Sequence, residues 1–134
     1  SVWLEFRRVL FRSDTANLNI TSTIANGKVV LTCGLTKATL AGLQIIMNYD
    51  STKLSLDGVT FNAGNTVTNF STHDNGRLTF GSIDQIKTAR ILTGTPYTLT
   101  FTPKVPLQNT AGLFFFVLAD AVDGSGNKIN VIVQ

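Results

Sequence analysis

The sequence has few of the side chains that perform chemistry. Its 134 residues include one cysteine (Cys33), one histidine (His73) and one tryptophan (Trp3). A single cysteine excludes an intrachain disulfide. Cys33 lies in an alternating apolar run, where we expect it to pack as a small hydrophobic side chain.

The same scarcity argues against an enzyme. His73 lies in the segment STHDNG, a predicted turn, where a solvated histidine is far more common than a general base. Most aspartates, among them Asp50, Asp57 and Asp74, stand next to Gly, Ser or Asn, and making turns is the ordinary role of aspartate in that setting. We therefore expect no catalytic residues, no metal site and no cofactor in this chain.

One segment has a partial likeness to a calcium loop. Asp123, Ser125 and Asn127 alternate like the first ligands of an EF-hand. However, glycine follows the first aspartate directly instead of standing at the sixth position, and no glutamate closes the loop. The segment is better explained as a turn between two strands.

The first residues have an unusual origin. Residues 4–13, LEFRRVLFRS, translate in register one reading frame of a common sequencing-library adapter, CTG GAG TTC AGA CGT GTG CTC TTC CGA TCT. A secretory n-region or an amphipathic membrane-binding helix would also mix arginines with apolar residues, but neither explains a literal translation of adapter DNA. We predict that residues 1–13 are not native and that residues 14–134 form a single domain.

This interpretation changes the charge balance. The chain carries a net charge of +3, and three arginines and one glutamate within residues 1–13 account for all but +1 of it. The remaining residues have no Lys/Arg cluster that would follow a phosphate backbone. The longest native apolar run, GLFFFVLA at 112–119, is too short to cross a bilayer as a helix. We expect no nucleic-acid partner and no membrane insertion.

What the sequence does have is the composition and periodicity of β-strands. It is rich in Thr, Asn, Gly and Val, and short runs alternate apolar with polar residues between turn signals. Asn26-Gly27 is a strong hairpin signal, HDNG at 73–76 is a second one, and Asp57-Gly58 suggests a bulge. The expected strands lie within 17–24, 28–35, 41–50, 54–62, 66–72, 77–83, 97–103, 112–122 and 127–134.

These strands predict an all-β fold. Eight to nine short strands without a convincing amphipathic helix indicate an antiparallel β-sandwich of jelly-roll or Greek-key type. The segment at 112–122 is almost continuously apolar, so we expect a central strand that is buried on both faces at its start.

The segment AGLQIIMNYDSTKLSLDGVTF at 41–61 resembles the cohesin family, and Gly42, Tyr49, Asp50 and Leu54 carry the resemblance. The earlier NGKVVLTCGLTKA and the later TPYTLTFTPK and ADAVDGSGNKINV resemble further stretches of that family in the same order. From the residues alone, Tyr49 is expected to bury its ring, Asp50 to cap the turn, and Leu54 to fill the core.

The resemblance implies a non-catalytic module, extracellular or at the cell surface, that binds a dockerin-bearing protein in cellulosome-like complexes. Calcium in such pairs belongs to the dockerin. The resemblance places the partner on one sheet face, through exposed residues of two strands: Gln44, Ile46, Asn48, Thr79, Gly81, Ile83 and Asp84. Two isoleucines there would supply an apolar centre, and the polar residues would supply hydrogen bonds around it.

A carbohydrate-binding or adhesive β-sandwich is the alternative. Modules that grip polysaccharide usually present exposed Trp or Tyr rings, which stack on sugars. Here Trp3 lies within residues 1–13, while Tyr49 and Tyr97 lie on alternating strands. This pattern weakens the polysaccharide alternative but leaves it open.

Overall fold

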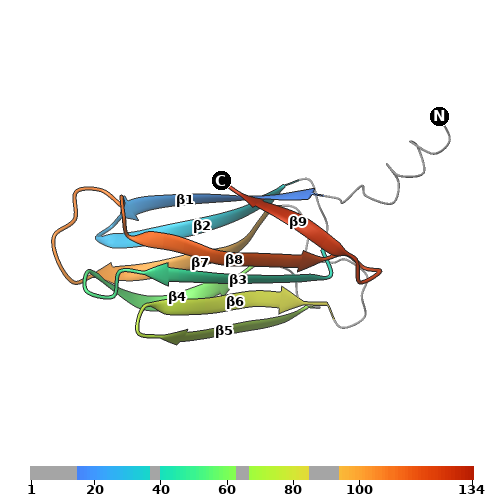
Figure 1. Ribbon diagram of the computed structural model, residues 1–134. Coiled ribbons are helices and arrows are strands. Elements are labelled where there is room, and N and C mark those ends of the chain that lie inside the picture. Colours follow the sequence, from blue (N-terminus) through green and yellow to red (C-terminus); the bar gives the residue numbers. More distant parts are fainter. Residues whose placement is uncertain (1–14, 37–39, 63–66, 85–93) are drawn as a thin grey trace.

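The computed structural model describes residues 15–36, 40–62, 67–84 and 94–134 (Figure 1). Residues 1–13, which we predicted not to be native, lie outside them. The described residues form nine strands: β1 (Thr15–Ala25), β2 (Lys28–Thr36), β3 (Gly42–Tyr49), β4 (Leu54–Phe61), β5 (Thr68–Asp74), β6 (Arg77–Ile83), β7 (Gly94–Pro103), β8 (Phe114–Val122) and β9 (Lys128–Val133). The prediction of an all-β fold with eight to nine strands is confirmed. Within the described ranges, no helix is long and apolar enough to span a membrane.

The strands are hydrogen-bonded in one continuous order, β4-β7-β2-β1-β9-β8-β3-β6-β5. This sheet folds over at β9, so that β4-β7-β2-β1 forms one layer and β8-β3-β6-β5 the other (Figure 1). Neighbouring strands are antiparallel, except that the first residues of β1 pair in parallel with Asn130–Val133 of β9. The result is the expected jelly-roll sandwich, with one parallel pair where the chain's first and last strands meet.

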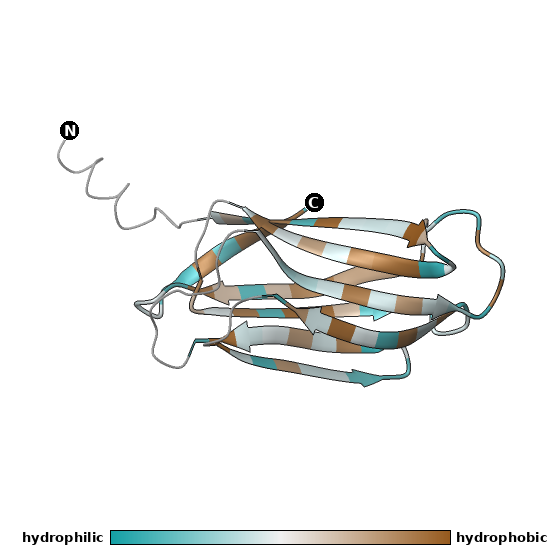
Figure 2. Ribbon diagram, turned by 180° about the vertical axis from the view of Figure 1, so that it is seen from behind, coloured by the Kyte–Doolittle hydropathy of each residue, from teal (hydrophilic) through white to brown (hydrophobic). Residues whose placement is uncertain are grey.

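Side chains from both layers meet in a single core. Apolar and polar residues alternate along most strands, visible in Figure 2 as brown segments between pale and teal ones, so one side of each layer faces inward. The ring of Tyr49 on β3 lies 5.1 Å from that of Phe101 on β7, and Phe80 on β6 lies 5.3 Å from Tyr97 on β7. Cys33 is completely buried in this core, as expected.

Both predicted hairpins are present. Asn26 and Gly27 have φ angles of 54° and 75° and join β1 to β2, while Asn75 and Gly76, at 46° and 88°, join β5 to β6. Positive φ at both central residues is the geometry of a tight two-residue turn, which Asn-Gly adopts readily. The turn at 73–76 sets the register of β6 against β5 and thereby fixes which β6 residues face outward.

Aspartates hold two connections between strands. The Asp50 side chain accepts a hydrogen bond from the Thr52 N–H at 3.0 Å, and the Asp123 carboxylate accepts from the N–H groups of Ser125 and Asn127 at 2.9 and 2.8 Å. The register of β4 against β7 shifts at Asp57, as the Asp57-Gly58 step suggested. The 123–127 segment is thus the predicted strand-connecting turn.

Candidate binding face

The outward-facing residues of β8, β3, β6 and β5 form one continuous surface, which we term the β3 face. The register aligns these strands closely: Ile46 lies opposite Thr79 on one side and Leu118 on the other, and Asn48 lies between Arg77 and Phe115. The outward positions are Phe115, Val117, Leu118, Asp120 and Val122 on β8, Gln44, Ile46 and Asn48 on β3, Arg77, Thr79, Gly81 and Ile83 on β6, and Phe70 and Thr72 on β5.

Most of the predicted site residues lie together on this face. Gln44, Ile46, Asn48 and Thr79 are partly exposed, and Ile83 is 50% exposed. The register therefore places these β3 and β6 residues side by side.

The prediction that Asp84 is exposed on this face is wrong, because Asp84 is only 1% exposed. Neighbouring residues of a strand point to opposite sides, and Asp84 continues the inward phase of Leu78, Phe80 and Ser82. Its backbone N–H donates to the Ala41 carbonyl at 2.8 Å, which fixes the chain just beyond β6. Asp84 and Ile83 therefore do not share a surface.

The prediction that Gly81 is exposed is also wrong, because Gly81 is buried although it occupies an outward position of β6. A Cβ atom added there would lie 2.8 Å from Cζ of Phe70 and 2.0 Å from the Leu43 carbonyl oxygen. The Phe70 ring on β5 thus covers Gly81, and Phe70 is the side chain that a partner would meet at this point.

Strand β8 adds several exposed apolar side chains to the face, and none of them was among the predicted site residues. Phe115 is 64% exposed, Val117 49% and Leu118 42%. The expectation that the start of this strand is buried on both faces is therefore wrong. The strand lies between β9 and β3, and of its three phenylalanines Phe114 and Phe116 pack against the core while Phe115 does not. A register shift opposite Ile46 and Met47 leaves Val117 and Leu118 both exposed.

Polar groups stand beside this apolar surface. Asp120 is aligned with Gln44 across the β3–β8 pair, and one Asp120 oxygen lies 3.9 Å from Nζ of Lys128. That distance and the exposure of both side chains, 46% and 81%, describe a weak ion pair. The Asp120 carboxylate is thus available to a hydrogen-bond donor of a partner.

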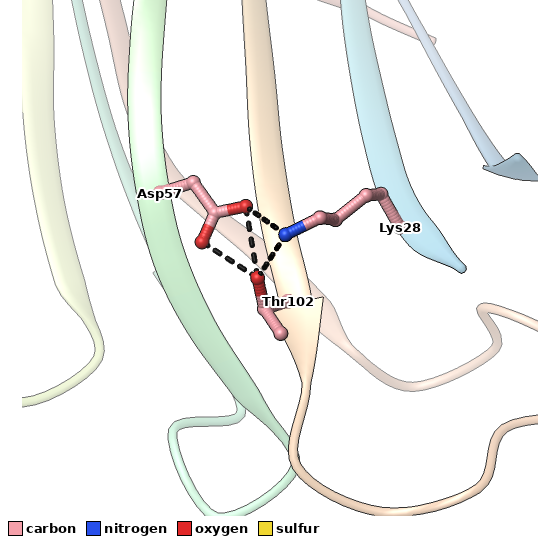
Figure 3. A network of polar contacts seen from close by, with 3 residues as sticks. All are labelled: Lys28, Asp57 and Thr102. Atoms are coloured by element: carbon pink, nitrogen blue, oxygen red, sulfur yellow. Dashed lines mark hydrogen bonds and ion pairs between the residues drawn. The ribbon is translucent and has the colours of Figure 1, made fainter. Parts of the chain in front are cut away.

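The outer side of the other layer, the β2 face, differs in chemistry. Thr21, Thr32, Thr98 and Thr60 are aligned in one row across β1, β2, β7 and β4. Beside this row, Lys28 Nζ donates to Asp57 at 3.0 Å and to Thr102 at 2.7 Å, and the Thr102 hydroxyl donates to both Asp57 oxygens (Figure 3). The Thr102 hydroxyl, and after it Lys28, lowers the pKa of the Asp57 carboxyl. Lys28 and Asp57 are therefore paired more closely, at 3.0 Å, than Lys128 and Asp120 beside the β3 face, at 3.9 Å.

Other kinds of site find little support. Within the described ranges, no three His, Cys, Asp or Glu side chains come together in a way that could hold a metal ion. Burial raises the pKa of the Cys33 thiol to about 12, which opposes the thiolate that a nucleophile would need. Tyr49 and Tyr97 are 8% and 0% exposed, so neither ring is available to stack on a sugar.

No protein-family model matches the sequence, and no curated protein is significantly similar to it. Solved structures do resemble the fold. The sixth cohesin of scaffoldin B from Acetivibrio cellulolyticus, solved with a mutant Cel5 dockerin, has a TM-score of 0.73 and 17% identity over 90% of this chain and 94% of its own.

Two further structures extend the likeness. A non-cellulosomal cohesin from the archaeon Archaeoglobus fulgidus has a TM-score of 0.70 and 13% identity, covering 89% of this chain and 86% of its own. The OlpA cohesin of Clostridium thermocellum, in a type I complex with a dockerin, has a TM-score of 0.68 and 12% identity, covering 90% and 99%. The chain thus has the fold of cohesin modules.

Proposed function

We propose that this domain is a non-catalytic interaction module and that its β3 face binds a dockerin domain. The observation that carries the proposal is the unequal chemistry of the two outer faces. Large exposed apolar side chains gather on the β3 face, whereas threonines and an internally paired ion cluster cover much of the β2 face. Clustered exposed apolar groups on a folded domain mark interaction surfaces.

The cohesin fold supplies the class of partner. Two of the similar cohesins were solved in complex with dockerins. Phe115, Leu118, Ile46 and Ile83 would form the dry centre of such an interface, and Gln44, Asn48 and Asp120 would supply hydrogen bonds at its margin. The Arg77 side chain, at the Asn48 end of the face, would add one cation.

With this role we propose a place outside the cell or at its surface, in cellulosome-like complexes that degrade polysaccharide. Calcium would then be held by the dockerin rather than by this chain. The Archaeoglobus cohesin is described as non-cellulosomal, so the kind of assembly is a separate question from dockerin binding. The alternative of a polysaccharide-binding module finds no support in the buried tyrosines.

Charge substitutions on the two faces test the proposal. Ile46→Asp and Ile83→Asp place a carboxylate in the proposed dry centre and should each weaken dockerin binding by about 100-fold or more, the range of an interface hot spot. Thr60→Asp is the matched control, because Thr60 is exposed on the β2 face. Binding would be measured by biolayer interferometry after circular dichroism confirms the fold of each variant.

Unchanged binding in both isoleucine variants would show that the interface lies elsewhere. Weakening by Thr60→Asp equal to theirs would show that added charge, and not the β3 face, is responsible.

A further inference from the structure

The β3 face contains a hollow of about 180 Å³ at the end where β3 begins. The residues that line it include Phe70, Ile83 and Val122, together with Gln44 and Asp120. A cavity of about 150 Å³ is sufficient to hold benzene. The hollow therefore has room for one aliphatic side chain.

Gly42 creates the space. It lies in register between Ile83 on β6 and Val122 on β8, and a Cβ atom on Gly42 would come within 2.9 Å of Val122 Cγ2. Its φ is not in the left-handed region, so the backbone conformation does not require glycine here. The missing side chain instead leaves a gap between two exposed apolar side chains, Ile83 at 50% and Val122 at 38%.

The lining of the hollow includes one charged residue. Asp120 is the only charged residue among those that line it, and its contact with Lys128 Nζ is a long 3.9 Å. Because Lys128 is 81% exposed, it can move aside at little cost. A cation carried by an incoming partner would complement the carboxylate.

We propose that this hollow is the anchor pocket of the β3 face, and that it receives one aliphatic side chain of the dockerin, next to a Lys or Arg of the same partner that pairs with Asp120. This inference rests on the proposed function, and it specifies which residue of a dockerin the domain selects. We therefore expect weak binding of dockerins that lack an aliphatic residue beside a basic one. When the pocket is only partly filled, the side chains that line it lose van der Waals contacts with the partner.

The first test uses a small probe and needs no dockerin. N-acetyl-leucinamide, titrated into the ¹⁵N-labelled chain, should shift the amide signals of Gly42, Gly81 and Val122 at millimolar concentration, whereas N-acetyl-serinamide should not. Gly42→Val fills the hollow and should abolish the shifts. Gly58→Ala is the matched control, since Gly58 lies on β4 and its added methyl meets nothing within 4 Å. Equal shifts from both probes, or leucinamide shifts that survive Gly42→Val, would overturn the pocket.

The second test uses the dockerin that binds most tightly. Gly42→Val should weaken it about tenfold or more, and Ile83→Ala, which removes a wall without adding a clash, should weaken it similarly. Asp120→Asn should weaken it less and should flatten the dependence of affinity on salt. If Leu118→Asp abolishes binding while Gly42→Val and Ile83→Ala do not change it, the pocket proposal fails and the proposed function stands. If no dockerin binds but leucinamide occupies the hollow, the proposed function fails and the pocket stands.

Discussion

The Tyr97 side chain extends across the core, so that its hydroxyl reaches the opposite layer. The hydroxyl donates to Ser82 Oγ at 3.0 Å, and Ser82 in turn donates to the Asn69 side-chain oxygen at 2.6 Å. Tyr97 and Ser82 are both fully buried. This polar chain therefore connects β7 of one layer with β6 and β5 of the other.

The order of donors and acceptors in this chain predicts that Tyr97→Phe and Ser82→Ala lower the free energy of unfolding by different amounts. Tyr97→Phe removes one donor but leaves Ser82 bonded to Asn69, so we expect a loss of about 1 kcal/mol in the free energy of unfolding. Ser82→Ala leaves the Tyr97 hydroxyl buried without its acceptor, which typically costs about 1–3 kcal/mol. Urea unfolding of both variants would compare them. A larger loss in Tyr97→Phe than in Ser82→Ala would contradict this description of the chain.

Because of the buried Cys33 thiol, the free energy of unfolding should depend on pH in the alkaline range. Burial raises the pKa of its thiol from 9.0 to about 12 in the folded protein. Only the unfolded chain therefore ionises readily above pH 9, and the stabilisation that is complete below pH 9 is lost as the pH rises toward 12. Burial likewise raises the pKa of Tyr97, from 10.0 to about 12, and adds to the loss above pH 10.

Removal of the thiol should flatten this decline. Cys33→Ala is expected to lower stability by a constant amount at neutral pH and to lose less stability than the wild type between pH 9 and 12. Urea unfolding across that range measures both slopes. Parallel slopes would show that the Cys33 thiol ionises similarly in the folded and unfolded chains.

The two hairpin glycines provide a comparison between elements. Both have positive φ, so an alanine at either position adopts a left-handed conformation at a cost of roughly 1–2 kcal/mol. A Cβ atom at Gly27 meets nothing within 4 Å, whereas one at Gly76 would lie 2.7 Å from the Tyr49 carbonyl oxygen. The Gly76 carbonyl also accepts a hydrogen bond from the Tyr49 N–H at 2.8 Å.

We therefore expect Gly76→Ala to destabilise the domain more than Gly27→Ala. Thermal unfolding followed by circular dichroism would rank the two variants. The same melting temperature in both would mean that the contact of Gly76 with the end of β3 contributes nothing beyond backbone conformation.

The strands differ in how far the sequence alone predicts them. Alternation along β3 correctly separates inward Leu43, Ile45 and Met47 from outward Gln44 and Ile46. The same rule, applied strictly beyond β6, would have placed Asp84 inside. In β8 the rule has no signal, because Phe114, Phe115 and Phe116 are chemically identical and only the pairing with β3 decides which ring faces the core.

The local turns were predictable because their residues determine them. Asn26-Gly27 and Asn75-Gly76 each specify a backbone conformation that few other pairs adopt. The hollow at Gly42 was not predictable in this way. It depends on three strands that are distant in sequence coming together with Ile83 and Val122 in register.

Across the whole molecule, the two layers share one core but present different outer surfaces. This asymmetry is what separates an interaction module from a sandwich with two solvated faces. We also propose that the domain consists of residues 14–134. Deletion of residues 1–13 should leave the melting temperature and the dockerin affinity unchanged while lowering the net charge from +3 to +1. A substantial fall in melting temperature would show that these residues pack against the domain.

The most direct test is calorimetric titration of the chain with dockerins from several specificity classes, in calcium and again with a chelator. We expect tight binding to at least one dockerin, with one-to-one stoichiometry, and loss of that binding when the chelator removes calcium from the dockerin. No heat of binding from any dockerin across a broad panel, with this chain shown to be folded, would contradict it.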